Sequence, residues 1–350
     1  MQNEARVQEL HRFRDKLDVP AVFGGVIDTE GNLALDVIGV LRRGHSEVAT
    51  ASDKIHIGSC LKMVTAALFG SFVSEHSANW DMPVTDLFPD LADSIAEGWH
   101  QRTVAELFYC LSGMMTNPPR QVLLSGHTDG RALPEQRSEM ATLAFSKPPH
   151  KPGRFAYSNM SYIVMGAAID RLSGTSFENA LRERVLDPLG VCSAGYGPPS
   201  EVWGHAPGVF IGGMALFKGT PVDPAQSKSD NPPVLSSAGT LHLNCEDWAK
   251  LLQLFQRESH LSIIEEDIIK RVLCLPQNKD ARMSMGWAPT DLEGVSVGAQ
   301  GSNTYWSATA LMDAGRRRVA FVVCNDGRSS VLRNSAFLTQ KLLQLSFNSG

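Results

Sequence analysis

Apolar positions in the first 60 residues switch between a helical and an extended period. Residues 3–17 place their apolar side chains three and four positions apart, which predicts an amphipathic N-terminal helix. The apolar runs 19–27 and 33–41 flank Asp-Thr-Glu-Gly-Asn, a turn-forming sequence, and therefore predict a β-hairpin. Residues 54–58 have an extended pattern and lead into a long apolar run, which predicts a helix that begins around Ser59.

The last third of the chain combines helical and extended patterns. Apolar positions over 245–256 have the period of an amphipathic helix, and those over 331–345 predict a C-terminal helix. Between these two helices lie four strand candidates, at residues 283–287, 294–299, 304–312 and 319–324.

The middle of the chain differs from both ends. Residues from about 80 to 200 contain short helical patterns interrupted by Pro and Gly, with helices expected over 161–172 and 176–186 and no strong strand signal. Residues 201–240 are rich in Gly, Pro and Ser, which predicts a long loop region that lies over a functional site.

Strands at both chain ends with helices between them predict an α+β fold of the α/β-sandwich kind. We expect one antiparallel β-sheet built from both ends of the chain and flanked by helices, with an inserted, mostly helical lobe. The chain, residues 1–350, would form a single domain. Its sheet lobe would take about 1–78 and 200–350, and its helical lobe about 79–199.

The composition is that of a soluble globular protein, with 43% hydrophobic and 20% charged residues. A net charge of −5 gives no reason to expect nucleic acid or an anionic membrane as a partner. No apolar run approaches the roughly 18–20 residues of a membrane span, and the N-terminus lacks the apolar core of a signal peptide. We therefore expect a cytoplasmic protein that acts on a small molecule, and the oligomeric state is left open.

Cysteine and histidine spacing favours neither a disulfide framework nor a metal site. The six cysteines contain no C-x-x-C pair and several lie in apolar surroundings, which is typical of reduced, mostly buried residues. The ten histidines form no H-E-x-x-H, H-x-H or H-x-x-x-H pattern, so we expect no metal and no cofactor. His205 either borders a pocket or has a structural role.

Ser59 and Lys62 form the one Ser-x-x-Lys sequence in the chain. Residues three apart on a helix share a face, so the two side chains become neighbours. A lysine amine that apolar residues desolvate can serve as a base for a serine nucleophile. The alternative is an N-terminal capping serine followed by a surface lysine.

Tyr157 and Asn159 form the one Tyr-x-Asn sequence. A tyrosine here can move a proton between serine, lysine and leaving group, and the asparagine can hydrogen-bond the lysine and a substrate carbonyl. For Tyr157 alone, a half-buried aromatic with a satisfied hydroxyl is the alternative. Further along, a backbone N–H of the Gly-flanked stretch 298–304 would form an oxyanion hole with that of Ser59, or the stretch is only a turn between strands.

Taken together, these motifs resemble those of the serine β-lactamase-related superfamily, which contains class C β-lactamases, D-alanyl-D-alanine peptidases and family VIII carboxylesterases. The order Ser-x-x-Lys, Tyr-x-Asn and C-terminal x-x-Gly is similar to the family's. Several flanking stretches, from about Val19 to Leu345, also resemble the family: Phe155-Ala-Tyr-Ser-Asn, Leu172-Ser-Gly-Thr-Ser-Phe, Asp187-Pro-Leu-Gly, Ser237-Ala-Gly-Thr-Leu-His and Asp247-Trp-Ala-Lys-Leu.

The resemblance implies a β-lactamase/transpeptidase-like fold and a role for each motif residue. Ser59 would be the nucleophile, Lys62 its activating partner and Tyr157 the general base or proton shuttle. The remaining four residues would bind substrate, with the amides of Ser59 and Ser302 holding the oxyanion: Asn159, Gln300, Gly301 and Ser302.

Two positions depart from the family pattern. The third motif usually begins with Lys or His, whereas this chain has Ala299. Because the family's cation binds a substrate carboxylate or tunes the tyrosine, its loss favours a neutral ester or amide. A histidine of the Leu-x-x-His-x-Ser-Gly stretch is replaced by Cys110.

Three functional hypotheses follow. The first is a serine hydrolase acting on small esters or amides, with transfer to a non-water acceptor as a variant of the same chemistry. The second is a β-lactamase or D-amino-acid peptidase of the same fold. The third is a catalytically weak binding or regulatory homologue, against which the joint presence of the serine, lysine, tyrosine and asparagine counts.

Overall fold

The structure is a computed structural model that describes residues 2–208, 210–211, 214–215, 219–261 and 263–346. Its main sheet has six strands in the order β10-β11-β12-β13-β1-β2, and every neighbouring pair is antiparallel. The strands are β1 (Ala21–Asp28), β2 (Leu33–Gly39), β10 (Ala288–Pro289), β11 (Val295–Ser302), β12 (Ser307–Asp313) and β13 (Arg318–Cys324). The pairing of β1 with β13 joins the two chain ends, which confirms the predicted sheet.

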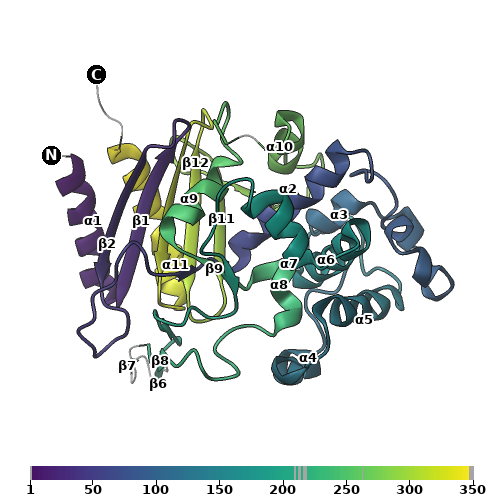
Figure 1. Ribbon diagram of the computed structural model, residues 1–350, viewed down its shortest axis with the longest axis horizontal. Helices are drawn as coiled ribbons and strands as arrows, with labels where there is room; N and C mark the ends of the chain where they lie inside the picture. Colours follow the sequence, from purple (N-terminus) through teal and green to yellow (C-terminus); the bar gives the residue numbers. More distant parts are fainter. Residues whose placement is uncertain (1, 209, 212–213, 216–218, 262, 347–350) are drawn as a thin grey trace.

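Helices cover both faces of this sheet (Figure 1). The helices α1 (Gln2–Leu17) and α11 (Ser329–Leu345) pack on one face, where Leu10 and Leu342 share an apolar cluster with Val22. Side chains of β1 alternate between faces, so its neighbour Phe23 belongs to the larger core on the other side. That side carries α9 (Cys245–Gln253).

The remaining helices gather beside the β11 end of the sheet (Figure 1). They are α2 (Leu61–Ser74), α3 (Val104–Phe108), α4 (Arg120–Ser125), α5 (Leu133–Phe145), α6 (Asn159–Ser173), α7 (Phe177–Leu181), α8 (Ser236–Gly239) and α10 (Glu266–Leu273). Thr103 and Glu106 form a capping box at the start of α3. The predicted lobe boundaries near residues 79 and 199 stay a prediction.

Short strand pairs lie outside the main sheet. They are β3 (Ile55–His56) and β4 (Gly195–Tyr196) on either side of β9 (Leu241–Leu243), β5 (Gly204–His205) with β8 (Pro221–Val222), and β6 (Phe210–Ile211) with β7 (Met214–Ala215). The described residues of the region 201–240, predicted as a long loop, therefore contain four of these short strands, β5 to β8, besides α8.

The strand predicted at 283–287 is wrong. These residues form an irregular bend, and the only strand nearby is the two-residue β10. Gly286 has a left-handed backbone (φ 96°), and a Cβ there would lie 2.4 Å from the Met63 backbone nitrogen. The apolar run is therefore buried as a bend against α2, which its hydrophobicity alone cannot distinguish from a strand.

The strand predicted at 304–312 begins later than expected. Asn303 Oδ1 accepts hydrogen bonds from the backbone N–H groups of Tyr305 (3.1 Å) and Trp306 (3.0 Å), which holds residues 303–306 in a turn. Trp306 is 1% exposed and packs in the core.

Among the described residues, no helix is long and apolar enough to cross a membrane.

His205 is fully buried and ties the 201–240 region to the sheet. Its Nε2 accepts a hydrogen bond from Arg43 N–H (3.1 Å), so Nδ1 carries the proton and donates to the Asn325 carbonyl. Burial lowers the pKa of His205 from 6.5 to about 4, although the hydrogen bond to Asn325 opposes the shift. The structural role left open by the sequence is therefore the one that the structure supports.

We expect His205 to make the protein less stable as the pH falls from 6.5 to about 4. In this window the unfolded chain binds a proton at His205 and the folded chain does not, so the free energy of unfolding falls with pH, by up to about 3 kcal/mol. Urea unfolding of wild type and His205→Asn at pH 7.5, 6.5, 5.5 and 4.5 measures this. The variant should start less stable and lose less stability on acidification, and equal losses in both proteins would contradict the assignment.

Candidate active site

Ser59 lies in a turn where the chain changes from strand to helix. Residues 58–60 form one turn of 3-10 helix between β3 and α2, and Gly58 has a left-handed backbone (φ 52°). From residue 55 to residue 70, every residue is buried except Ser59. The fold therefore makes one hydroxyl of this apolar segment accessible from outside.

Lys62 lies one helical turn after Ser59 and is only 1% exposed. Its Nζ lies 3.2 Å from Ser59 Oγ, 2.8 Å from Asn159 Oδ1 and 2.6 Å from the Ala238 carbonyl oxygen. These partners belong to the 3-10 turn before α2, to α6 and to α8. A buried amine needs such partners, because burying it without hydrogen bonds would cost several kcal/mol.

Asn159 begins α6, and local hydrogen bonds fix its orientation. Ser158 caps the helix, since its Oγ accepts from Ser161 N–H (2.9 Å) and donates to the Met115 carbonyl (2.7 Å). The Asn159 side chain accepts from Lys62 through Oδ1 and donates through Nδ2 to Asn117 Oδ1 (2.8 Å). Only one amide orientation satisfies both contacts.

Tyr157 lies beside the amine at the rim of the site. Its ring centroid is 5.1 Å from Lys62 Nζ, and its side chain is 41% exposed. The backbone before and after it is bound to Cys110, whose carbonyl accepts from Ala156 N–H (3.0 Å) and whose Sγ accepts from Ser158 N–H (3.4 Å). Cys110 thus holds the residues on both sides of Tyr157.

Strand β11 meets the turn of residues 58–60 at Gly301 and Ser302. A Cβ on Gly301 would lie 2.2 Å from the Ile57 carbonyl and 2.7 Å from the Ser59 amide nitrogen, and one on Gly58 would lie 2.4 Å from the Ser302 nitrogen. The two backbones approach this closely because both positions are glycine. The amide nitrogens of Ser59 and Ser302 therefore lie at the same junction.

The structure does not bring Gln300 to this junction. Side chains alternate along a strand, so the residue next to Gly301 faces the other side of the sheet. Gln300 Nε2 donates to the Leu332 carbonyl of α11 (2.7 Å) and to Thr309 Oγ1 (3.1 Å). Ala299 shares the face of Gly301, is 5% exposed and belongs to the core cluster that contains Cys60.

Two thiols flank the site, and burial keeps both neutral. Burial raises the pKa of Cys60 to about 12 and that of Cys110 to about 11, while Lys62 opposes both shifts and the hydrogen bond from Ser158 also opposes that of Cys110. A thiol reacts as its thiolate. Both cysteines therefore stay as unreactive thiols near neutral pH.

The segment that supplies the Ala238 carbonyl is anchored by a buried ion cluster. Arg137, which is fully buried, pairs with Asp170 (2.7 Å) and Glu178 (2.8 Å) and donates to Ser236 Oγ (2.8 Å). Ser237 Oγ donates to the Tyr162 carbonyl (2.9 Å). These bonds hold α8 against α6, opposite Lys62.

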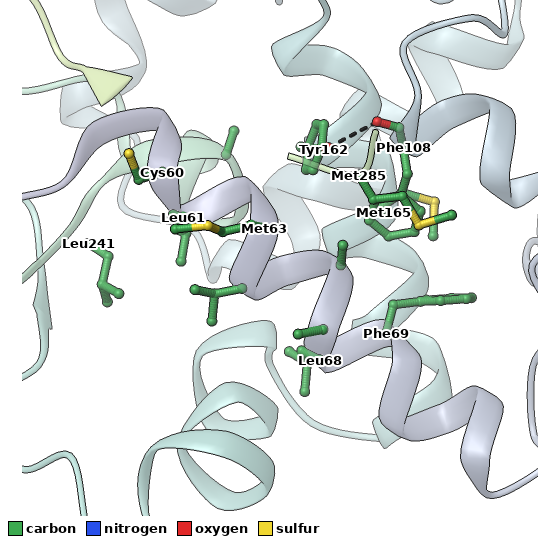
Figure 2. Close-up of a cluster of buried hydrophobic side chains, with 14 of the residues drawn as sticks. Cys60, Leu61, Met63, Leu68, Phe69, Phe108, Tyr162, Met165, Leu241 and Met285 are labelled. Carbon is green, nitrogen blue, oxygen red and sulfur yellow. Dashed lines mark hydrogen bonds between the residues drawn. The ribbon is translucent and has the colours of Figure 1, made fainter. Parts of the chain in front are cut away.

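Apolar side chains of α2 and of its neighbours form a buried cluster (Figure 2). Side chains of α2 and its preceding turn, among them Leu61, Met63 and Phe69, pack with Met165 and Met285. Tyr162 also borders the amine, with its ring 5.2 Å from Lys62 Nζ, but its hydroxyl donates to the Phe108 carbonyl (3.0 Å). Burial raises the pKa of Tyr162 well above its usual value, so this hydroxyl stays protonated.

Sequence reasoning missed several parts of the site. The Ala238 carbonyl carried no signal, because every residue has one, and Asn117 lies in no recognisable motif.

In the part of the chain that the structure describes, no three His, Cys, Asp or Glu side chains come together as a metal site would require.

Comparison with known sequences gives one family match over nearly the whole chain. The model of the Beta-lactamase family matches residues 8–344. Penicillin-binding protein 4 of Amycolatopsis lactamdurans is 28% identical over 162 residues, 46% of this chain and 41% of that protein. The unguisins hydrolase ungD' of Aspergillus campestris is 25% identical over 209 residues, 57% of this chain and 38% of that protein. The chain thus matches only about two fifths of the length of these curated relatives.

Among solved structures, D-amino acid amidase from Ochrobactrum anthropi SV3, complexed with D-phenylalanine, has a TM-score of 0.77 to this chain at 18% identity. The match covers 99% of both chains. At this identity the likeness shows the fold alone, which is the β-lactamase/transpeptidase-like fold expected from the motifs.

We expect Gly301→Ala to push β11 away from the turn of residues 58–60. The new methyl group would have to displace backbone atoms and not a flexible side chain, so we expect a loss of about 1–3 kcal/mol in the free energy of unfolding. Gly130→Ala is the matched control, because a Cβ there meets nothing within 4 Å. Urea unfolding of the three proteins measures the difference, and equal midpoints would contradict the close approach.

Proposed function

Because the chain belongs to the β-lactamase family, we propose that it is a serine hydrolase that forms an acyl-enzyme on Ser59 and acts on small esters or amides. The observation that carries the proposal is the 3.2 Å contact between Lys62 Nζ and Ser59 Oγ, in a site where Lys62 is buried and Ser59 is accessible.

Lys62 is arranged to accept a proton from Ser59. In its neutral form the amine has two N–H groups, which the Asn159 side chain and the Ala238 carbonyl accept. The lone pair is then left for the Ser59 hydroxyl. As Ser59 Oγ attacks the substrate carbonyl, its proton passes to Lys62, which becomes an ammonium with three donors.

Tyr157 can complete the proton transfer to the leaving group. Its ring beside Lys62 stabilises the ammonium by a cation–π contact, and its exposed position gives the hydroxyl access to bound substrate. The proton moves from the ammonium through the phenol to the departing alcohol or amine. Water, or another acceptor, then attacks the acyl group by the same route in reverse.

In this proposal the junction of β11 with the turn of residues 58–60 supplies the oxyanion hole. The N–H groups of Ser59 and Ser302 would bind the negative oxygen that develops on the attacked carbonyl. Each such donor is worth about 10²–10³-fold in rate. The close packing of Gly301 against the turn supports this role, since it brings the two amides to one place.

The substrate we favour is neutral at the position that the family's third-motif cation contacts. Ala299 is buried in the core and provides no charge to bind a carboxylate. The Gln300 side chain is bound to α11, so we no longer assign it a substrate contact.

Two alternatives remain for the same site. The first is a β-lactamase or D-amino-acid peptidase, favoured by the likeness in fold to D-amino acid amidase and disfavoured by Ala299. The second is a catalytically weak binding homologue. A binding protein needs no buried amine hydrogen-bonded to an accessible serine, so the site favours catalysis.

We expect the wild type to hydrolyse p-nitrophenyl acetate and butyrate, to turn over nitrocefin poorly, and to lose ester hydrolysis in Ser59→Ala. The loss should be at least about 10³-fold, because the nucleophile itself is removed. Release of p-nitrophenol and the mass of the acylated protein measure both steps. Fast nitrocefin turnover would favour the β-lactamase alternative, and inertness of both proteins without an acyl adduct would sink the hydrolase proposal.

Tyr157→Phe should lower kcat/KM for the esters by about 10²–10⁴-fold, as expected for loss of a general acid–base group. Because Tyr157 lies at the rim and is 41% exposed, the free energy of unfolding should change by less than about 0.5 kcal/mol. Steady-state kinetics and urea unfolding on the same preparation separate the two effects. Activity within twofold of wild type would remove Tyr157 from the mechanism.

A further inference from the structure

A buried carboxylate lies behind the candidate oxyanion hole and has no part in the chemistry proposed above. Asp230 is 8% exposed and is located in the segment between β8 and α8. Its Oδ2 accepts from His56 Nε2 (2.9 Å), and its Oδ1 accepts from Asn303 Nδ2 (2.8 Å) and from Asn231 N–H (2.7 Å). The carboxylate therefore accepts all three of these hydrogen bonds.

One side of the carboxylate leads to the turn of residues 58–60. His56 is fully buried, and its Nδ1 accepts from the backbone N–H of Gly58 (3.1 Å). Because Nδ1 accepts, the proton of the neutral ring is on Nε2, where it is donated to Asp230. Gly58 has the left-handed backbone that sets the direction of the following Ser59 N–H.

The other side leads to the end of β11. Asn303 follows Ser302 directly and is 3% exposed. It donates to Asp230 through Nδ2, and its Oδ1 accepts from the backbone N–H groups of Tyr305 and Trp306. The carboxylate thus holds the residue next to the second oxyanion amide.

We propose that Asp230 is a positioning residue that, through His56 and Asn303, holds the two amide donors of the oxyanion hole in register. This inference rests on the proposed function, since it concerns the amides of Ser59 and Ser302. The bridge joins segments 56–58 and 302–306, which are about 250 residues apart in sequence and whose backbones approach each other closely at Gly58 and Ser302.

The polarity of the bridge makes a carboxylate necessary. An asparagine at position 230 could accept from His56 or from Asn303 and Asn231, but its NH₂ group would then face a donor on the other side. If the Asn303 amide turned to accommodate it, the N–H groups of Tyr305 and Trp306 would lose their acceptor. If His56 changed tautomer instead, its Nδ1 would carry the proton and Gly58 N–H would lose its acceptor. Asp230→Asn therefore leaves at least one end of the bridge unsatisfied.

The first test compares wild type, Asp230→Asn and the control Asp223→Asn, which makes the same change in an exposed turn of the same region. Hydrogen–deuterium exchange should become faster in peptides covering 57–60 or 302–306 of Asp230→Asn alone, while β1 and β13 keep their protection. The maximal rate of Ser59 acylation by p-nitrophenyl acetate should fall about 10- to 100-fold. The substrate concentration for half-maximal rate should stay within about twofold.

The second test separates positioning from simple packing at His56. Asparagine can place an acceptor near the Nδ1 position and so keep the Gly58 bond, whereas glutamine reaches toward Asp230 and leaves Gly58 N–H without its acceptor. We expect Ser59 to be acylated about 5- to 10-fold faster in His56→Asn than in His56→Gln, because the rate depends on the position of the turn.

Three outcomes would overturn the inference: unchanged exchange in both peptides, faster exchange over the whole chain together, or an acylation rate like that of wild type. Equal rates for the two His56 variants would remove the role of the Gly58 bond. If wild type forms no adduct on Ser59, the proposed function fails. The exchange measurement then still decides whether Asp230 holds the two segments, so the two failures are distinguishable.

Discussion

A primary amine buried at the junction of three helical segments is the constraint on which the rest of this site depends. Lys62 is almost without solvent access, so its hydrogen bonds must come from the protein. Ser59, Asn159 and Ala238 provide them from positions about 180 residues apart in the chain. Each partner is in turn fixed by its own element: the 3-10 turn, the capped start of α6, and the α8 segment held by Arg137. The hydrogen bonds that satisfy the buried amine therefore also bring the residues of the candidate site together.

Backbone contact between the sheet and the turn of residues 58–60 is the second constraint. Gly58 and Gly301 allow β11 to touch the turn directly, and Gly286 lets the bend before β10 pack on the backbone at the start of α2. A side chain at any of these positions would separate the sheet from the helix that carries Ser59 and Lys62. The glycines thus act by their lack of a Cβ, and two of them also by a left-handed backbone.

Polar groups behind the site follow one pattern, in which a buried charged side chain binds partners from separate segments. Asp230 accepts from His56 and Asn303, and Arg137 donates to Asp170 and Glu178. Such networks are stabilising only when every member is satisfied. They restrict the segments beside the site to one arrangement, as catalysis by positioned amides and a positioned amine requires.

The sequence by itself determined the elements whose periodicity is strong and local: the N-terminal helix, the first hairpin, α2, β13 and α11. Its motifs also named Ser59, Lys62, Tyr157 and Asn159, because helix spacing and motif order are properties of the chain itself. Only the tertiary structure decided that the apolar run at 283–287 is a bend, that Gln300 faces α11, and that Ala238 supplies a carbonyl to Lys62. These outcomes depend on which face of a strand meets a neighbour and on which backbone group lies near a side chain. Contacts between residues far apart in sequence set both, and no local pattern records them.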